Sequence, residues 1–154
     1  MKRVLFVCLG NICRSPTAEG VMRVKADQRG IELYIDSAGT GGWHIGNAPD
    51  TRMTEAAKRR GYDLSKQRAR QVDLADFYEF DLILAMDLRN QADLLAMAPP
   101  NREADIRLFL DFSDCETRET PDPYYGGEAG FNLVLDLVEA GADGLLDYLE
   151  NESG

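Results

Sequence analysis

Short apolar runs alternate with longer segments of helical periodicity along this chain. Three of the runs predict buried strands, over Arg3–Cys8, Glu32–Ser37 and Phe80–Met86, and a weaker fourth candidate lies at Ile106–Leu110. The segments between and after them predict helices, over Pro16–Arg29, Thr51–Arg60, Leu88–Met97 and 128–150. Near-continuous apolar strands that alternate with helices are typical of an α/β fold with a mostly parallel central sheet.

The composition is that of one packed domain. The chain has 154 residues, of which 44% are hydrophobic and 29% are charged, and only 6 are proline. This length matches that of a single domain, and no stretch has the composition of a linker between two cores. We therefore expect one domain over residues 1–154, and we expect neither a disordered nor a fibrous protein.

The balance of charges limits the partners. Lys and Arg number 17 against 27 Asp and Glu, which gives a formal net charge of -10. That sign is unfavourable for a protein that binds nucleic acid or anionic lipid. An anionic ligand would therefore need a local binding device that overcomes the overall charge.

Neither the start of the chain nor its cysteines indicate export. The apolar run Val4–Leu9 is shorter than the core of a secretory signal and lacks a small-residue cleavage site. No segment approaches the roughly 18 apolar residues of a membrane span. Three cysteines, Cys8, Cys13 and Cys115, are too few and too unevenly placed for a disulfide framework. We expect a reducing, cytoplasmic location and thiols that are free for chemistry.

The turn after the first strand has the features of an anion site. Residues 8–15, CLGNICRS, join the first strand to the first long helix, and Ser15 and Pro16 suit the N-cap and first position of that helix. Backbone N–H groups converge at such a helix start, where the helix dipole favours negative charge. Gly10 and Asn11 are residue types that tolerate the left-handed backbone of a tight cradle.

Two side chains at the ends of this turn are suited to binding and attacking a phosphoryl group. Arg14 offers a planar fork for two oxygens of a phosphoryl group, and Cys8 lies where the helix dipole and Arg14 stabilise a thiolate. The alternative is a buried cysteine at a strand end and a solvated arginine, and the spacing alone does not exclude it. Zinc ligation by Cys8, Cys13 and His44 would lack a fourth partner, so we expect no metal and interpret His44 as a loop residue.

Residues 4–20, VLFVCLGNICRSPTAEG, resemble the signature of the low molecular weight protein tyrosine phosphatases. The resemblance continues through DSAGTGGWHIGNAPD at 36–50, the MD-x-x-N stretch Met86–Asn90 and DPYYGG at 122–127. It implies a four-stranded parallel sheet flanked by helices, with a phosphate loop between the first strand and the first helix. It also implies no cofactor and a cysteinyl-phosphate intermediate.

The resemblance also implies roles for individual residues. Cys8 would be the nucleophile, Arg14 the phosphate clamp and Asp122 the general acid, while Ser15 would favour the leaving thiolate. The phosphate-binding residues implied are Leu9, Gly10, Asn11, Ile12, Cys13 and Ser15. Chemistry supports a carboxyl in the Asp122 role, since expulsion of a phenolate needs a proton donor and the later hydrolysis needs a base. On its own, an Asp-Pro pair in a loop is usually only a turn.

Three aromatic residues are candidates for substrate binding. Trp43, Tyr124 and Tyr125 would form a wall around a flat phenyl ring, and the alternative is that they pack beneath their loops. Ser37 would support the loop by holding Asn11, as a serine does in the family. Many relatives add a histidine from the segment matching Leu64–Gln71, which here reads LSKQRARQ.

Several functions remain open at this level. Ile12 favours phosphotyrosine, since the arginine phosphatases of this fold tend to have threonine there. An arsenate reductase would need a further redox cysteine pair, and a non-catalytic phosphotyrosine-binding module would be expected to lose Cys8 or Asp122. We therefore expect a tyrosine phosphatase that acts on tyrosine-phosphorylated proteins, among them a cognate kinase, and releases inorganic phosphate.

Cys13 is a candidate redox partner of Cys8. Both cysteines lie in the same short loop, so oxidation of Cys8 to a sulfenic acid would be trapped as a Cys8–Cys13 disulfide. The alternative is that Cys13 only packs beneath the loop.

Overall fold

The computed structural model describes residues 1–123 and 127–153, and within them the chain forms one four-stranded parallel sheet. The strand order is β2-β1-β3-β4. The strands are β1 (Lys2–Cys8), β2 (Leu33–Gly39), β3 (Leu82–Ala85) and β4 (Asp105–Leu108). All three neighbouring pairs run parallel. The α/β fold and the parallel sheet expected from the sequence are confirmed.

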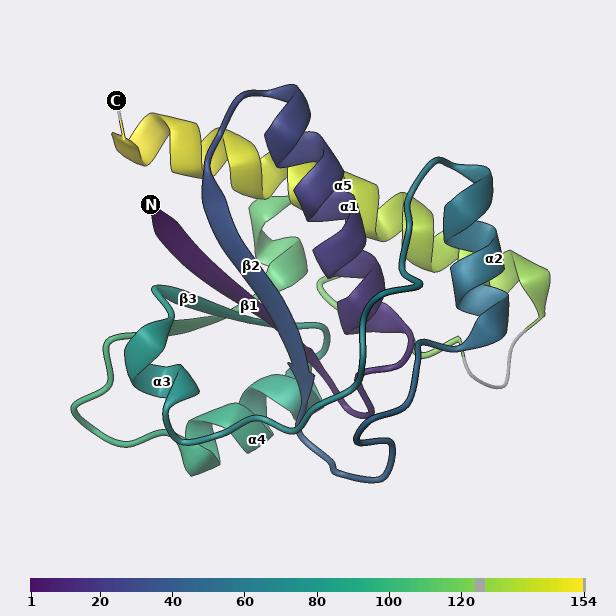
Figure 1. The fold of residues 1–154 in the computed structure, drawn as a ribbon. Coiled ribbons are helices and arrows are strands. Elements are labelled where there is room, and N and C mark those ends of the chain that lie inside the picture. The colour runs from purple at the N-terminus through teal and green to yellow at the C-terminus, as the bar shows by residue number, and fades with distance from the viewer. Residues whose placement is uncertain (124–126, 154) are drawn as a thin grey trace.

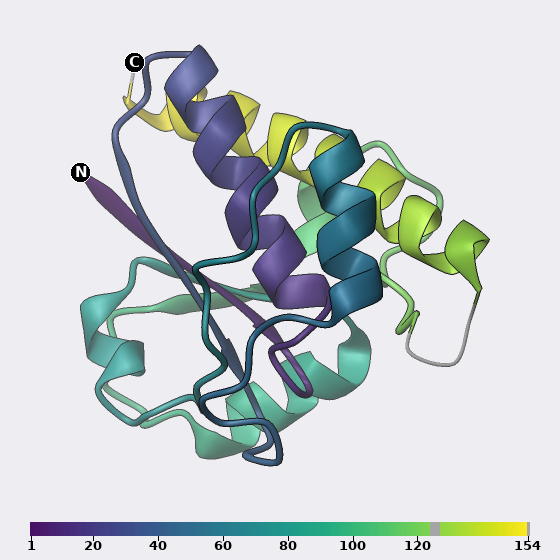
Figure 2. The same cartoon turned by 45° about the vertical axis from the view of Figure 1, so that its right-hand side comes forward.

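Helices cover both faces of the sheet (Figures 1 and 2). On one face lie α1 (Arg14–Gln28), α2 (Thr51–Arg59) and the long α5 (Glu128–Ser153), together with the 3-10 helix η1 (Phe109–Phe112). On the other face lie α3 (Asp76–Glu79) and α4 (Leu88–Met97). The crossovers between parallel strands thus supply α1, α2, α3 and α4, and the segment after β4 adds η1 and α5.

The position of the central strand β1 between two covered faces explains why its sequence is almost entirely apolar. Val4 and Phe6 pack into the core beneath α1 and α5, whereas Leu5 and Val7 pack into the core beneath α3 and α4. All four side chains are completely buried. A strand that is covered on both faces has no solvent side, so its sequence shows no alternation of polar and apolar residues.

The element boundaries differ from the prediction in ways that have physical causes. The predicted helix Leu88–Met97 is confirmed, and the strand expected over Phe80–Met86 is limited to Leu82–Ala85. The strand expected over Ile106–Leu110 ends at Leu108, where the chain turns into η1. The four-residue α3 was not predicted, because a single turn is too short to show a helical period.

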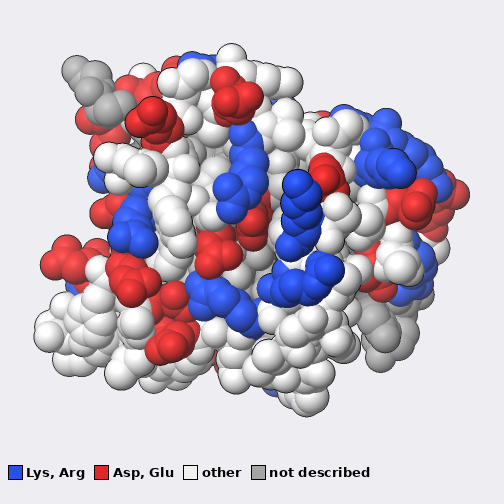
Figure 3. All heavy atoms as spheres, in the orientation of Figure 1, with Lys and Arg blue, Asp and Glu red and all other residues white. Residues whose placement is uncertain are grey.

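The carboxyl ends of the parallel strands meet at one edge of the sheet, where the loops after β1, β2 and β3 come together (Figure 1). This is the edge at which α/β proteins bind ligands. On the face shown in Figure 3, Lys and Arg side chains are interspersed with Asp and Glu. Within the described residues, no helix is both long and apolar enough to cross a membrane.

Candidate active site

The loop between β1 and α1 curls around the sulfur of Cys8. Asn11 has φ 57°, and its N–H donates to Cys8 Sγ at 3.3 Å. The left-handed conformation expected for Asn11 is confirmed, whereas that expected for Gly10 is wrong, since Gly10 does not have a positive φ. Gly10 instead makes room for a neighbour: a Cβ there would lie 3.0 Å from Cδ2 of His44.

Glycine at position 39 lets the end of β2 approach this loop closely. Gly39 pairs with Cys8 across the two strands, and a Cβ on it would lie 2.7 Å from the Leu9 carbonyl oxygen and 3.2 Å from the Asn11 nitrogen. The next two residues continue the contact, because Thr40 N–H donates to the Cys8 carbonyl and Gly41 N–H to that of Leu9. A side chain at position 39 would therefore push the anion loop out of shape.

Ser15 does not cap the helix, contrary to the sequence-based expectation. The helix begins at Arg14, and Cys13 is the N-cap residue. Ser15 is therefore the second helical residue and is completely buried, with its Oγ 2.9 Å from Cys8 Sγ. Pro16 follows in the first turn, where a missing N–H costs no hydrogen bond. The hydroxyl thus faces the sulfur instead of the helix start.

Arg14 is held by a carboxylate and a carbonyl. Its Nη1 donates to Asp87 Oδ2 at 2.7 Å and to the Thr120 carbonyl at 3.0 Å, and its side chain is only 4% exposed. Burial on its own lowers the pKa of this guanidinium, but the neighbouring Cys8 and Asp87 outweigh it and raise the pKa above the ordinary value. Arg14 is therefore a fixed positive charge beside Cys8.

Asn11 is fixed from three directions. Its Nδ2 donates to Ser15 Oγ at 2.9 Å and to Ser37 Oγ at 3.0 Å, and its Oδ1 accepts from the Arg70 N–H at 3.0 Å. The contact of Ser37 with Asn11 expected from the resemblance is thus present. Both Arg70, whose backbone N–H contacts Asn11, and Gln67 belong to the segment Leu64–Gln71, which lacks the histidine of many relatives. The Oε1 of Gln67 lies 3.5 Å from Ser37 Oγ.

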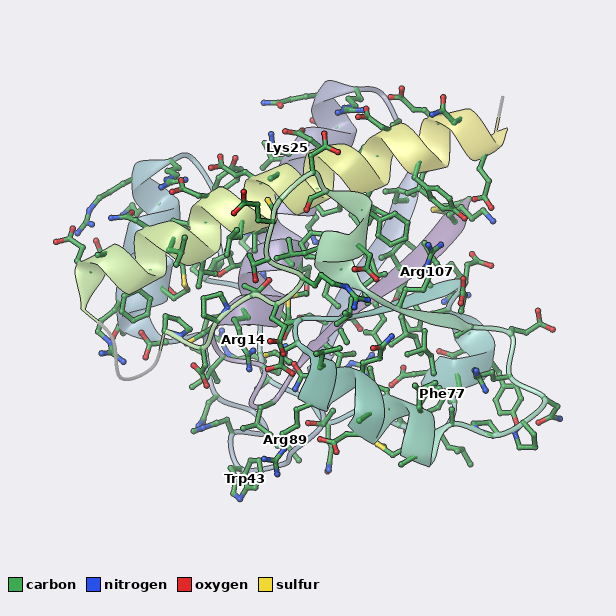
Figure 4. The ribbon with its side chains drawn as sticks, turned by 180° about the vertical axis from the view of Figure 1, so that it is seen from behind. Arg14, Lys25, Trp43, Phe77, Arg89 and Arg107 are labelled. Carbon is green, nitrogen blue, oxygen red and sulfur yellow. The ribbon has the colours of Figure 1, made fainter. Side chains whose placement is uncertain are left out.

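The loop between β1 and α1 borders a cavity of about 300 Å³ at the edge of the sheet. It is lined by Cys8, Leu9, Gly10, Ile12, Cys13, Arg14, Trp43, His44 and Asp122. Figure 4 shows Trp43 at the periphery of the molecule and Arg14 in its interior, and Trp43 is 73% exposed. The candidate substrate residues Tyr124 and Tyr125 lie outside the described residues.

Cys13 lies in the wall of this cavity. Burial is the main cause that raises its pKa above the ordinary value of a thiol, and the negative charge of Asp50 adds to it. Cys8 and Cys13 are both free cysteines. Across the described ranges, no group of three or more His, Cys, Asp or Glu side chains is arranged to hold a metal ion.

Some residues of the site were not singled out from the sequence. Asp87 lies in the stretch Met86–Asn90 that carried the resemblance, and it is the N-cap of α4 as well as the partner of Arg14. An aspartate directly before a helical segment is an N-cap signal, but only the fold brings it to Arg14. His44, interpreted only as a loop residue, lies in the cavity wall, a position for which its sequence context gives no signal.

Comparison with known proteins agrees with this geometry. The model of the family described as low molecular weight phosphotyrosine protein phosphatase matches residues 3–153. The low molecular weight protein-tyrosine-phosphatase YfkJ of Bacillus subtilis is 43% identical, over 99% of this chain and 98% of its own. A crystal structure of a protein tyrosine phosphatase from Entamoeba histolytica has a TM-score of 0.95 at 41% identity and covers both chains completely.

A structure of an arginine phosphatase from Drosophila is also similar, with a TM-score of 0.91 at 34% identity over 97% of this chain and 98% of that one. The fold and the site define an enzyme class whose phosphate loop joins the first strand of a parallel sheet to the first helix. The chain belongs to the low molecular weight phosphotyrosine protein phosphatase family.

Proposed function

We propose that this chain hydrolyses phosphotyrosine in proteins, with Cys8 as the nucleophile. The observation that carries the proposal is the convergence of Cys8, Arg14 and Asp122 on one cavity. Further support comes from the Asn11 N–H and the Ser15 hydroxyl, which both contact the sulfur. A thiolate with these donors and a fixed guanidinium beside it has the arrangement that nucleophilic attack on a phosphate dianion requires.

In the first step the Cys8 thiolate attacks phosphorus, so that an S–P bond forms as the bond to the tyrosyl oxygen breaks. The Asp122 carboxyl transfers its proton to that oxygen, and the tyrosine side chain leaves neutral. Arg14 neutralises charge on the equatorial phosphoryl oxygens, where its fork geometry is complementary. Its anchoring by Asp87 and Thr120 keeps that fork in place throughout.

In the second step the Asp122 carboxylate removes a proton from water, which attacks phosphorus and breaks the S–P bond. Inorganic phosphate is released and Cys8 returns as a thiolate. The Ser15 hydroxyl, 2.9 Å from the sulfur, stabilises this leaving group. The partners are tyrosine-phosphorylated proteins, with a cognate tyrosine kinase among them, and the site of action is the cytoplasm.

Turnover of a phosphotyrosine peptide, compared with a phosphoarginine peptide and with arsenate, tests this function. We expect turnover of the phosphotyrosine peptide alone, and mass spectrometry of acid-quenched enzyme should show phosphate on Cys8. Cys8→Ser should abolish turnover and retain binding of inorganic phosphate, because the N–H groups and Arg14 remain. Turnover by Cys8→Ser would refute the role of Cys8, and preferred turnover of phosphoarginine would refute the substrate class.

A further inference from the structure

Ion pairs neutralise most of the basic side chains of this acidic chain. Acidic residues outnumber basic ones by 27 to 17. For example, Lys25 and Arg29 of α1 both pair with Asp143 of α5, and Arg59 of α2 pairs with Glu128 at the start of α5. A basic side chain that is exposed and has no such partner is therefore an exception, and its position in the fold is informative.

Four exposed basic side chains form no ion pair within the described part of the chain. They are Lys58, Lys66, Arg68 and Arg89. The carboxylate of Asp63 lies near both lysines, so one negative charge faces two ammonium groups there. Arg68 and Arg89 have no carboxylate partner among the described residues. These two arginines thus carry positive charge that the chain itself does not neutralise.

Backbone hydrogen bonds attach the segment that carries Arg68 to the loop that borders the cavity. The Ala69 N–H donates to the Asn47 carbonyl, and the Ala69 carbonyl accepts from the Gly46 N–H, both at 2.8 Å. The same loop contributes Trp43 to the cavity wall. Because Arg68 directly precedes Ala69, its backbone is held beside the rim of the site.

The guanidinium of Arg68 is positioned without being neutralised. Its Nη1 donates to the Ser65 and Gln67 carbonyls at 2.9 and 2.6 Å. Both acceptors are uncharged and belong to the turn just before Arg68. A guanidinium has five N–H donors, so donors on its other nitrogens remain for a further acceptor. Holding the side chain in advance also reduces the entropy that a partner must overcome on binding.

Arg89 lies on the opposite side of the cavity from Arg68. In the sheet, β1 lies between β2 and β3, and the segment of Arg68 pairs with the end of β2. Arg89 instead follows β3, two residues after Asp87, which holds the guanidinium of Arg14. Figure 4 shows Arg89 and Trp43 at the same edge of the molecule, whereas Arg14 lies in the interior. Positive charge therefore flanks the cavity on its β2 side and on its β3 side.

We propose that Arg68 and Arg89 bind carboxylates on either side of the substrate's phosphotyrosine, so that the preferred substrates are proteins phosphorylated within acidic segments. The inference rests on the proposed function, since it concerns which phosphotyrosine the site accepts. A short acidic segment is complementary in charge to the two arginines. An extended anionic surface, such as a membrane, would also meet the remainder of a chain whose net charge is -10.

The two arginines should act on substrate binding and leave the chemical step unchanged. An exposed ion pair changes affinity by at most about fivefold, so each arginine contributes a small factor. The contribution should fall with salt, because the screening length decreases from about 10 Å at 0.1 M to about 3 Å at 1 M. Since neither arginine lines the cavity that holds the phosphoryl group, its loss should raise KM without lowering kcat.

The test compares two phosphotyrosine peptides of equal length, one flanked by Asp and Glu and the other by Asn and Gln. In low salt we expect wild type to have a KM about tenfold lower for the acidic peptide, and near 1 M salt about the same KM for both. Arg68→Gln and Arg89→Gln should each reduce this advantage about threefold, and the double variant should remove it.

Two controls accompany these variants. Lys2→Gln removes an exposed charge at the opposite end of β1 and should behave as wild type. A small aryl phosphate, which has no flanking residues, should be hydrolysed equally by all variants.

Equal KM values for the two peptides with wild type, or a preference that survives in the double variant, would overturn the proposal. Binding to phosphatidylserine vesicles that depends on the two arginines, without a preference for the acidic peptide, would assign them to a membrane surface instead. Titration of Cys8→Ser with both peptides measures Kd without turnover. Tighter binding of the acidic peptide, together with no hydrolysis of either peptide by wild type, would refute the proposed function and leave the docking role intact.

Discussion

Arg14 and Asp87 form an ion pair of 2.7 Å between the first turn of α1 and the N-cap of α4. One Asp87 oxygen accepts a hydrogen bond from Arg14, and the other accepts one from the Asn90 N–H at 2.7 Å. A single carboxylate therefore fixes both the start of a helix and the orientation of the guanidinium that faces the cavity. The two sites are 73 residues apart in sequence.

This dual contact leads to a prediction for two variants of Asp87. Asp87→Asn can still cap α4 through its amide oxygen, but it turns an amide donor toward Arg14. We therefore expect kcat to fall about 10- to 100-fold, which corresponds to the loss of one charged hydrogen bond, and we expect little change in Tm. Asp87→Ala should in addition lose about 1 kcal/mol of stability with the cap.

Steady-state kinetics and thermal melts of both variants check this prediction. Asp111→Asn, which removes the partner of the exposed Arg118, is the matched control and should leave kcat unchanged. An Asp87→Asn enzyme with wild-type kcat would show that Asp87 acts only as a cap.

The role of Asp122 predicts a dependence on the leaving group. Asp122→Asn should slow the hydrolysis of tyrosyl phosphate by roughly 10²–10⁴-fold, because the phenolate then leaves without a proton. Aryl phosphates with a nitro-substituted leaving group need less protonation and should be slowed less. Initial rates on both substrates measure the difference, and equal losses would indicate a structural role for Asp122.

Trp43 should affect substrate binding and leave the chemical step and the fold nearly unchanged. Its side chain is 73% exposed, so Trp43→Ala removes little buried surface and should hardly change Tm. Loss of aromatic stacking should raise KM for aryl phosphates by a factor that corresponds to about 0.5–1.5 kcal/mol. A lowered Tm with an unchanged KM would show that the indole supports the fold instead.

Cys13 should make inactivation by peroxide reversible. Peroxide converts Cys8 to a sulfenic acid, and attack by Cys13 would form the disulfide and release water. Burial raises the pKa of Cys13, so this attack should be slow at neutral pH and faster in alkali. We expect thiol reagents to restore the activity of peroxide-treated wild type and Cys115→Ser, but to restore the activity of Cys13→Ser less completely. Equal recovery of all three would contradict the disulfide.

Ionisation of the buried Glu19 should lower the free energy of unfolding of the protein as the pH rises. Burial is the main cause that raises its pKa above 4.5, so the folded state binds this proton more tightly than the unfolded state. The penalty is absent at pH values below the unfolded pKa and complete above the folded one. The free energy of unfolding of Glu19→Gln minus that of wild type should therefore increase from acid to neutral pH in urea titrations. A constant difference would contradict this.

The sequence by itself determined the fold class and the loop between the first strand and the first helix, and it placed Cys8 and Arg14 at the two ends of that loop. Strand β1 is apolar without alternation because both of its faces are covered, and the spacing from Cys8 to Arg14 is local enough for one loop and one helix start to hold both residues. The left-handed Asn11 also follows from residue type, since asparagine tolerates that conformation.

Only the tertiary structure decided which distant groups complete the site. Asp87 meets the loop because β3 runs parallel to β1 and ends at the same edge of the sheet. Arg70 is placed by its carbonyl, which accepts from the Gly39 N–H, and Thr120 by its N–H, which donates to the Met86 carbonyl. The pairing of β1 with β2 brings Ser37 near Asn11. Ser15 illustrates the difference: its local sequence suits an N-cap, yet burial against Cys8 and Asn11 gives its hydroxyl better partners than the helix start does. Local preference fixes the elements, whereas the direction of a buried hydrogen bond depends on all the neighbours that the fold assembles.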